Sequence, residues 1–274
     1  MLDAAEARWL AWHEACAHGL IGREVRDLGD GVLLHDPVDH EPFWNRIAGI
    51  AWPQEAKAFD RRLAEIFGLF SSLDRVPHLW PTPGFDAPDD LVARLLSHGF
   101  EDMGAGLLMA FDPDGPEPAA AGSIGSAPGL TIERLHRTAG PAAEEAARAI
   151  ALVLGESFGV EPDRVGAIEQ ETLVLLGRDE FHACLARIDG EPAATARRTT
   201  FAGASYLSSI GARPQFRGRG LGRLVSEAVL RDAIDARSRW TYLGVFAENV
   251  VARRMYEGLG FVALSAPGPD LLLR

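Results

Sequence analysis

The segment Ile210-Gly-Ala-Arg-Pro-Gln-Phe-Arg-Gly-Arg-Gly-Leu-Gly222 decides the fold of this chain, because it joins an apolar strand to an amphipathic helix through a loop of glycine and arginine. Gly218, Gly220 and Gly222 allow a phosphate to approach the backbone closely, and the first turn of the helix presents unpaired N–H groups and the positive end of its dipole. Pro214 stops the strand from pairing further. The segment therefore predicts a binding site for an anion.

Three phosphate-binding motifs are candidates for this loop. The dinucleotide pattern G-x-G-x-x-G fails, because a match that starts at Gly218 ends at Arg223 and no parallel sheet is predicted around it. The loop of nucleoside-triphosphate enzymes needs Gly-Lys-Ser or Gly-Lys-Thr, and Lys57 is the chain's only lysine. The pattern that remains is R-x-x-G-x-G, which Arg217, Gly220 and Gly222 fill.

This pattern resembles the acetyl-CoA pyrophosphate loop of the GNAT acetyltransferase superfamily, together with the strand Leu207-Ser-Ser-Ile-Gly-Ala-Arg-Pro214 before it. A second segment, Asn249-Val-Val-Ala-Arg-Arg-Met-Tyr-Glu-Gly-Leu-Gly-Phe261, resembles the superfamily's second CoA-facing helix and the turn behind it. A glycine and arginine pattern alone could be a polar turn. Two motifs at a suitable separation, on the right elements, favour a GNAT domain instead.

The resemblance implies which residues hold acetyl-CoA. The backbone of Ile210, Gly211 and Ala212 would pair with the pantetheine arm, and an N–H group of this strand would hold the oxyanion of the reaction. The pyrophosphate would lie on the loop and the first helical turn, at Arg217, Gly218, Arg219, Gly220, Leu221, Gly222 and Arg223. Asn249 would either contact the cofactor or cap its own helix, since it lies seven residues before Tyr256 and on nearly the same helical face.

Tyr256 matches the tyrosine that in many relatives protonates the leaving thiolate, and a phenol of pKa about 10 suits that task. Its alternative role is packing. The attacking amine must lose a proton, and Glu171 is our candidate general base. Glu169, His182 and Glu248 remain alternatives, because nothing in the sequence separates a base from a surface carboxylate.

The order of predicted elements in the second half is strand, helix, antiparallel meander, helix, strand, helix, strand, which describes an α+β domain with a mixed, mostly antiparallel sheet flanked by helices. Asp189-Gly190 suits a tight hairpin. The expected strands are 130–135, 181–188, 192–201, 206–213, 240–246 and 261–264, and the expected helices are 141–158, 220–236 and 249–257. In the first half we expect helices at 4–18, 54–70 and 89–98, and strands at 31–35, 47–52, 76–80 and 106–111.

The first half resembles a second, degenerate GNAT copy. Its segment 91–111 ends a helix in Gly-Phe before a strand, as the later motif does. The R-x-x-G-x-G match in this half, Arg26-Asp-Leu-Gly-Asp-Gly31, contains two aspartates and leads into the expected strand 31–35 instead of a helix, so it lacks the setting of the later loop. We therefore expect a tandem arrangement in which residues 1–125 bind no CoA and serve the acceptor site or the scaffold, while residues 126–274 bind acetyl-CoA. The linker is expected at 112–129. Trp44, Trp52 and Trp80 could line an aromatic acceptor pocket or be buried scaffold.

Charge is unevenly distributed. Residues 1–125 hold 21 Asp and Glu against 9 Lys and Arg, a net charge of −12, whereas residues 126–274 hold 18 of each, a net charge of zero. This excludes a basic footprint for nucleic acid and favours a cationic small-molecule partner, although an acidic surface also aids solubility.

Other classes of site are disfavoured by the composition. Cys16 and Cys184 are the only cysteines and lie far apart in sequence, and the eight histidines show no ligand spacing, so we expect neither a disulfide nor a metal. No apolar run approaches a membrane span, and Met1–Arg8 lacks the pattern of a secretory signal, which predicts a cytoplasmic protein. Arginine in place of lysine, with high Ala, Gly and Pro content, suggests a GC-rich bacterial genome.

The sequence thus predicts an N-acyltransferase that moves an acetyl group from acetyl-CoA directly to a primary amine of a small molecule, peptide or antibiotic. The alternative is a non-catalytic sensor that binds acyl-CoA and regulates a partner. A nucleotide-dependent enzyme is disfavoured by the absence of both nucleotide motifs. The acceptor, the acyl length and the oligomeric state stay open.

Overall fold

The computed structural model describes residues 2–115 and 128–274, and it divides into two compact units. Unit 1 consists of Met1–Met109, Gly244–Arg253 and Ala263–Arg274, and unit 2 of Ala110–Leu243 and Arg254–Val262. The division passes through two strands and one helix near the C-terminus. Two segments of the C-terminal half therefore belong to unit 1.

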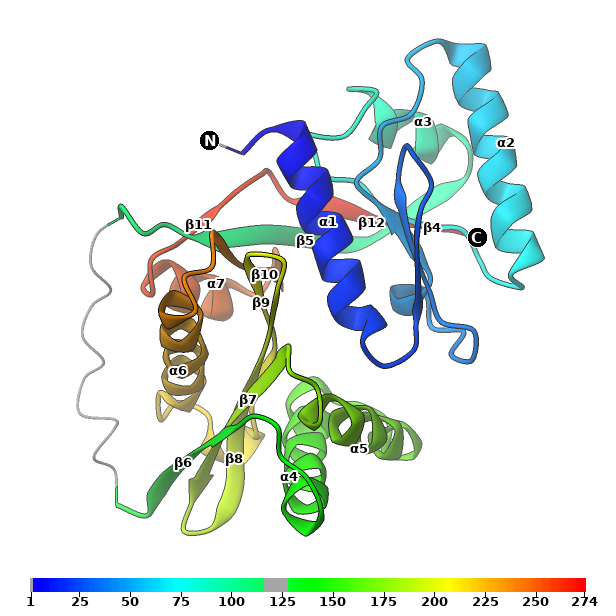
Figure 1. Ribbon diagram of the computed structural model, residues 1–274. Coiled ribbons are helices and arrows are strands. Elements are labelled where there is room, and N and C mark those ends of the chain that lie inside the picture. Colours follow the sequence, from blue (N-terminus) through cyan, green and yellow to red (C-terminus); the bar gives the residue numbers. More distant parts are fainter. Residues whose placement is uncertain (1, 116–127) are drawn as a thin grey trace. The chain divides into compact units, whose positions relative to one another are not determined.

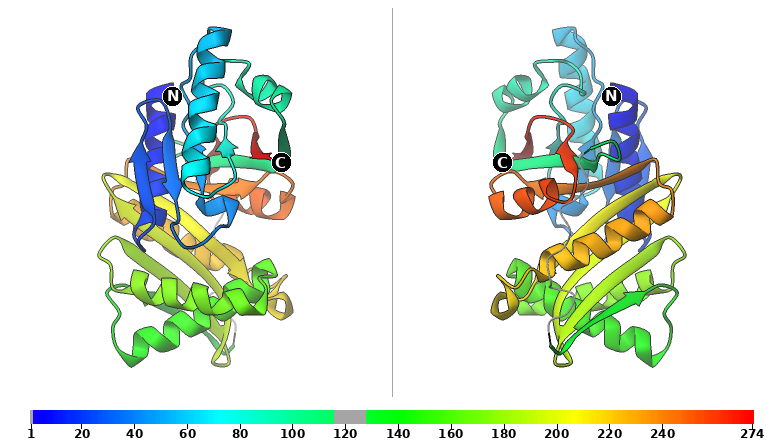
Figure 2. Two further views of the ribbon diagram at one scale, coloured as in Figure 1. Left: turned by 90° about the vertical axis from the view of Figure 1, so that its right-hand side faces the viewer. Right: turned by 90° about the vertical axis from the view of Figure 1, so that its left-hand side faces the viewer.

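Unit 2 is a sheet with helices on both faces (Figure 1). Its strand order is β10-β9-β8-β7-β6, in which β9 through β6 are antiparallel and β10 is parallel to β9. Helix α6 contacts β7, β8 and β9 on one face, while α4 and α5 cover the other face (Figure 2). The elements are β6 (Leu130–Leu135), α4 (Pro141–Phe158), α5 (Pro162–Leu176), β7 (Phe181–Ile188), β8 (Glu191–Phe201), β9 (Ala204–Ala212), a 3₁₀ turn (Pro214–Phe216), α6 (Leu221–Asp235), β10 (Trp240–Phe246), α7 (Val250–Glu257) and β11 (Phe261–Ala263).

Local chemistry explains the elements that matter for the site. Asp189 and Gly190 have φ angles of 50° and 83°, as a two-residue hairpin between right-twisted strands requires. Helix α6 forms because its apolar residues recur on one face, and that face is buried against the sheet. The buried residues of α6 are Leu221, Val225, Ser226, Ala228, Val229, Leu230 and Ala233.

The strands of unit 1 follow one another in the order β1-β2-β3-β4-β12-β5. β3 and β4 are parallel, and α2 connects them. The apolar stripe Phe59, Leu63, Ile66 and Phe70 of α2 is buried in the same core as Leu33, Ile47 and Leu79 of the sheet. The elements are α1 (Ala4–Gly19), β1 (Glu24–Asp27), β2 (Val32–His35), a 3₁₀ turn (Pro42–Trp44), β3 (Arg46–Ala48), α2 (Ala56–Ser72), β4 (His78–Trp80), α3 (Leu91–Ser97), β5 (Phe100–Phe111) and β12 (Gly268–Leu273).

The predicted α+β class with a mixed, mostly antiparallel sheet is confirmed. Among the α-helices and strands of the described residues, three were not predicted: the helix α5 and the strands β1 and β12. The expected strand 47–52 is shorter, because β3 ends at Ala48 and only Ala51 makes a further bridge, to Ala87. Much of the expected linker 112–129, and the expected boundary near residue 125, lie outside the described residues. The assignment of residues 1–125 and 126–274 to separate domains stays a prediction.

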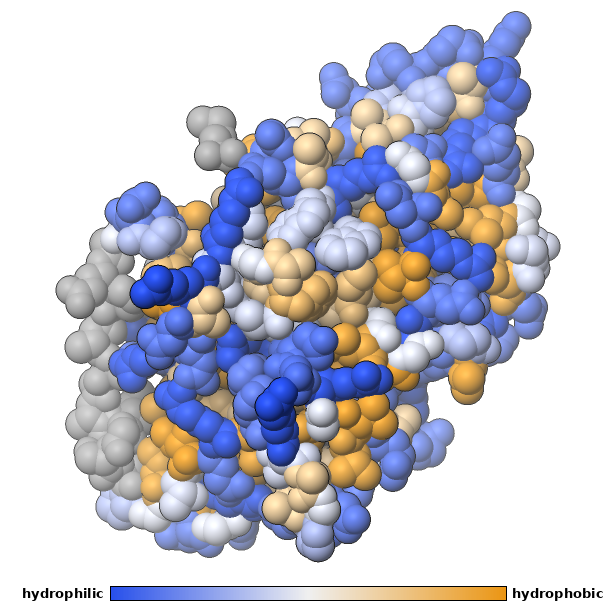
Figure 3. Space-filling model, in the orientation of Figure 1, coloured by the Kyte–Doolittle hydropathy of each residue, from blue (hydrophilic) through white to orange (hydrophobic). Residues whose placement is uncertain are grey.

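In residues 2–115 and 128–274, no helix is both long and apolar enough to cross a membrane. Figure 3 shows hydrophilic residues spread over the face that it draws, with hydrophobic residues between them.

Candidate active site

Strand β9 separates from β10 halfway along its length. The parallel pairing runs from Ala204 opposite Trp240 to Leu207 opposite Leu243, and among the described residues it does not continue beyond Leu207. On the other side, the register with β8 shifts between Thr195 and Arg197, where Ser209 adopts a φ of 50°. This bulge places an extra residue in β9 and redirects the strand. In the part of the chain that the structure describes, the backbone of Ile210, Gly211 and Ala212 thus has no strand partner on the β10 side.

The free end of β9 is packed closely against α4. A Cβ atom added to Gly211 would lie 2.8 Å from both Cβ and Oγ of Ser157, so only glycine fits at this position. Phe158 of α4 also lies near this glycine. This close contact with α4 holds the end of β9 in place on one face of the sheet.

The loop after β9 opens the N-terminus of α6. Gly218 and Gly220 have φ angles of 75° and 76°, in the left-handed region that favours glycine. Gly220 is the N-cap residue of α6, and no side chain caps the helix there. The first backbone bond of the helix runs from Leu224 N–H to the Gly220 carbonyl. The amides of the turn before it, at Leu221 and Gly222, are thus available to an anion, aided by the helix dipole.

The arginines of the loop mainly order its backbone. Arg217 donates from Nη2 to the Ser157 carbonyl at 2.9 Å and from Nε to the Ala212 carbonyl at 3.3 Å. Arg223 donates to the Gly258 carbonyl at 3.1 Å, at the end of α7. Arg219 is exposed, with its guanidinium 5.5 Å from the centre of the Phe216 ring. Arg217 therefore ties the loop to the end of β9 and to α4, a role that the motif alone did not reveal.

We expect Arg217→Ala to weaken acetyl-CoA binding by about tenfold, because two hydrogen bonds that fix the loop are lost while the amides themselves remain. Calorimetric titration measures this change. Arg178→Ala, which removes an exposed arginine elsewhere in unit 2, serves as the control for net charge and should leave the affinity unchanged. Equal affinities for the Arg217 and Arg178 variants would show that the loop does not depend on this clamp.

Helix α7 carries the second predicted motif. Asn249 lies just before the helix, and its Oδ1 accepts a hydrogen bond from Ala252 N–H at 3.1 Å. Asn249 therefore caps the N-terminus of α7. Met255 lies beside the first turn of α6, since a Cβ added to Gly222 would be 3.7 Å from its Sδ. Tyr256 is 6% exposed and packs against Phe261. Its hydroxyl forms no hydrogen bond within the described part of the chain, and burial raises its pKa above the usual value.

The candidate bases lie in different environments. Glu171 on α5 is the acidic neighbour of Arg197, a buried residue of β8 whose Nη2 also contacts Thr172. Burial lowers the pKa of Arg197 to about 10, and the attraction of Glu171 opposes that shift. Glu169 lies 3.7 Å from Arg148, and Glu248 lies in the turn before α7. Burial, then Arg198 and His136, lower the pKa of His182 to about 4, so this imidazole is neutral at pH 7.

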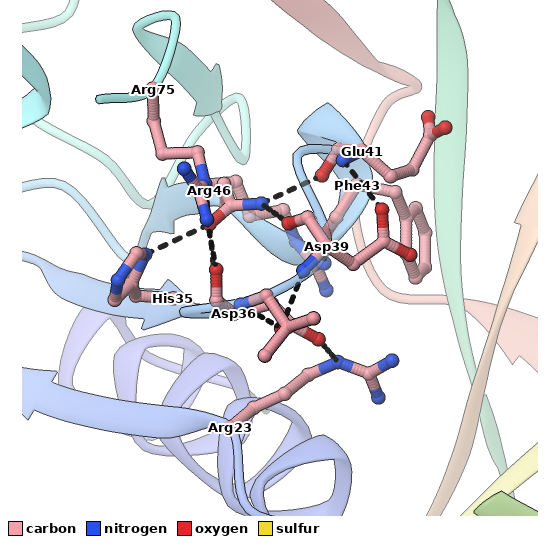
Figure 4. Close-up of polar contacts among 10 residues, drawn as sticks. Arg23, His35, Asp36, Asp39, Glu41, Phe43, Arg46 and Arg75 are labelled. Atoms are coloured by element: carbon pink, nitrogen blue, oxygen red, sulfur yellow. Dashed lines mark hydrogen bonds and ion pairs between the residues drawn. The ribbon is translucent and has the colours of Figure 1, made fainter. Parts of the chain in front are cut away.

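Unit 1 contains a buried polar hub around Asn45, which the sequence analysis did not identify (Figure 4). Asn45 is 1% exposed and connects the ends of the loop between β2 and β3. Its Oδ1 accepts from His35 Nδ1 (2.9 Å), Asp36 N (3.0 Å) and Arg75 Nε (3.2 Å), and its Nδ2 donates to the carbonyls of Asp39 (2.7 Å) and Glu41 (2.9 Å). The segment Phe43–Gly49 could have pointed to this hub, because it holds the chain's only asparagine besides Asn249.

The three tryptophans that were candidates for an acceptor pocket are each covered by other parts of the protein. Trp52 is 3% exposed and belongs to the apolar core, so it cannot line a solvent-accessible site. Arg23 lies 3.6 Å from the centre of the Trp44 ring, and Arg46 lies 4.1 Å from that of Trp80. The protein's own guanidinium groups therefore cover ring faces that a cationic acceptor would need.

Possible metal ligands are scattered. Among residues 2–115 and 128–274, no three His, Cys, Asp or Glu side chains are grouped so that they could hold a metal ion. Cys184 is buried, and burial raises its pKa to about 11, which makes it an inert thiol.

Comparison with known proteins agrees with this geometry. Residues 146–261 match the Acetyltransferase (GNAT) family. A mycothiol acetyltransferase from Nocardiopsis dassonvillei is 40% identical over 73 residues, which cover 27% of this chain and only 19% of that protein.

Two solved structures extend the likeness to nearly the whole chain. A GCN5-related N-acetyltransferase from Kribbella flavida has a TM-score of 0.66 at 23% identity, over 97% of this chain and 95% of that one. A tandem GNAT protein from the clavulanic acid biosynthesis pathway has a TM-score of 0.59 at 16% identity, over 99% and 96%. Residues 146–261 thus match the GNAT acetyltransferase family, and the fold of nearly the whole chain resembles that of a tandem GNAT protein.

Proposed function

We propose that this protein is an acetyl-CoA-dependent N-acetyltransferase that acts by direct transfer on a primary amine of a small molecule, peptide or antibiotic. The observation that carries the proposal is the combination of a strand with unpaired backbone and a helix N-terminus capped only by Gly220. The unpaired strand suits an extended amide chain, and the helix N-terminus suits a pyrophosphate.

The loop, the strand β9 and Tyr256 would each have a separate role in the reaction. The loop amides and the first turn of α6 bind the pyrophosphate, and Ile210–Ala212 orient the pantetheine arm by strand-like hydrogen bonds. The neutral amine nitrogen attacks the thioester carbonyl, a C–N bond forms, and an N–H group of the same strand stabilises the oxyanion. As the C–S bond breaks, Tyr256 donates its proton to the thiolate. Burial raises its pKa, so the phenol holds this proton at neutral pH, although the same shift makes it a weaker acid.

Glu171 is our candidate for the group that removes the proton of the amine. It lies on α5, on the sheet face opposite α6, next to the buried Arg197. We place the reaction in the bacterial cytoplasm and infer a cationic acceptor from the acidic excess of residues 1–125.

Tyr256→Phe tests the catalytic part of the proposal. The variant keeps the ring that packs against Phe261 and removes only the hydroxyl. We expect turnover to fall at least about tenfold while the affinity for acetyl-CoA stays within about twofold. Release of the CoA thiol, measured with a panel of polyamines, aminoglycosides and peptides, gives the turnover. An active wild type with an equally active variant would remove Tyr256 from the mechanism; acetyl-CoA binding without turnover on any amine would favour a non-catalytic sensor.

We also propose that the first half is a degenerate copy that binds no CoA. Its helix α2 follows β3 and precedes the parallel strand β4, as α6 follows β9 and precedes β10. However, Glu55 caps α2, and its carboxylate accepts from Lys57 N at 2.9 Å and Ala58 N at 2.7 Å. These bonds lower the pKa of Glu55. A side chain of the protein therefore occupies the place where a phosphate would bind.

A further inference from the structure

A row of basic side chains crosses the strands of unit 2 near the C-terminal end of α6. His182 on β7 lies opposite Arg198 on β8. His136, which follows β6, stacks on His182 with ring centres 4.0 Å apart and ring planes within 4° of parallel. Arg134, two residues earlier, forms an ion pair with Asp232 of α6. The row runs from the exposed His136 to the buried Arg198.

Arg198 is the unusual member of this row. It is 3% exposed, and its Nη1 donates to Thr200 Oγ1 at 2.7 Å, but its Nε is buried without a hydrogen-bond partner in the described residues. Burial, and then repulsion from Arg134, lower its pKa to about 10, so it is still charged at neutral pH. A buried cation that lacks an anionic partner is costly, and proteins normally pair such a group.

The neighbouring Arg197 shows what pairing looks like in the same strand. It points to the other face of the sheet, where Glu171 attracts its charge and Thr172 accepts a hydrogen bond from it. Around Arg198 the polar groups are instead hydroxyls: Thr200 contacts Ser205 at 2.6 Å, and Ser205 contacts Ser238 at 2.8 Å. Hydroxyls can donate to an anion but cannot neutralise a guanidinium.

We propose that this row binds a small oxyanion, either free phosphate or the phosphate group of a metabolite, with Arg198 as its charge partner. The guanidinium supplies a fork of donors, and the neutral imidazole of His182 and the hydroxyl groups supply further donors without adding charge. An anion would reach the row from the side of His136, which is exposed. This site is distinct from the pyrophosphate loop, because Asp232 lies 11 residues after Leu221, which is about 16 Å along α6.

The test is a titration of the full chain with inorganic phosphate. The NMR signals of the histidine rings report the binding. The Gly220→Glu variant is titrated in parallel, since its pyrophosphate loop is closed to phosphate. We expect the signals of His136 and His182 to shift with the same millimolar affinity in both proteins, while sodium chloride at equal ionic strength leaves them in place. A phosphomonoester such as glycerol phosphate identifies the source: tighter binding than phosphate indicates a metabolite, and equal or weaker binding indicates the free anion.

Arg198→Met should reduce the affinity for phosphate at least about tenfold, and Arg137→Met, which removes an exposed arginine paired with Asp179, should not change it. Should Arg198→Met fail to fold, Arg198→Lys keeps the charge but loses the fork, and a clear loss of affinity is again expected. The proposal is overturned if phosphate causes no shift of His136 and His182 in the wild type, if chloride causes the same shift, or if a folded Arg198 variant binds phosphate like the wild type. None of these results depends on acetyl-CoA binding.

Discussion

Replacing Gly220 with glutamate is expected to weaken acetyl-CoA binding by at least about 100-fold, which corresponds to about 2.7 kcal/mol. Gly220 has a φ of 76°, a conformation that costs a residue with a Cβ about 1 kcal/mol or more. The new carboxylate would also lie at the N-terminus of α6, where it competes with the pyrophosphate for the same amides. Glu55 of α2 is the precedent within this chain, since its carboxylate accepts two such N–H groups.

The matched control is Gly203→Glu, measured by the same calorimetric titration. Gly203 lies in the hairpin between β8 and β9, has a φ of 83°, and has open space where a Cβ would be added. This variant introduces the same strain and the same charge away from the loop, so its affinity should equal that of the wild type. A Gly220→Glu protein that binds acetyl-CoA like Gly203→Glu would exclude the loop as the pyrophosphate site.

Asn45→Ala is expected to destabilise unit 1 by about 3 kcal/mol, because it removes five hydrogen bonds of a fully buried side chain and leaves their partners unsatisfied. Urea unfolding followed by tryptophan fluorescence is a suitable measurement. Trp9, Trp12, Trp44, Trp52 and Trp80 all lie in unit 1, and Trp240 alone lies in unit 2, so the signal reports mainly on unit 1.

Val38→Ala is the control for the Asn45 variant, since it changes the same loop at a side chain that is 84% exposed. Its unfolding midpoint should stay close to that of the wild type, because surface substitutions usually change stability by less than about 0.5 kcal/mol. A similar small effect for Asn45→Ala would mean that the loop between β2 and β3 does not depend on the hub.

The sequence predicted the parts of the site that depend on local chemistry. The amphipathic stripe of 220–236 anticipated α6 to within one residue at each end, and Asp189-Gly190 anticipated the hairpin. The glycines of the loop were recognisable because left-handed backbone and an uncapped helix require them. The bulge at Ser209 was not predictable, since serine seldom adopts a positive φ and the shift depends on pairing with β8.

Elements that depend on distant contacts were missed. β12 contains Gly268 and Pro269, which disfavour a strand, but it pairs with β4 and β5 far away in the sequence. A Cβ at Gly268 would lie 2.3 Å from the Pro81 carbonyl, so the glycine permits a close approach. Helix α5 was predictable in principle, because Pro162 occupies its first turn and proline favours the start of a helix. The partnership of Glu171 with Arg197 could not be read from residues 26 positions apart.

The central claim, that the chain binds one acetyl-CoA through the loop at α6, is tested most directly by calorimetric titration of the wild-type protein with acetyl-CoA. We predict micromolar binding with a stoichiometry of one per chain, because Gly220 leaves the N-terminus of α6 open and Glu55 closes that of α2. An absence of binding would contradict the acetyltransferase assignment, and two sites per chain would contradict the degenerate first copy.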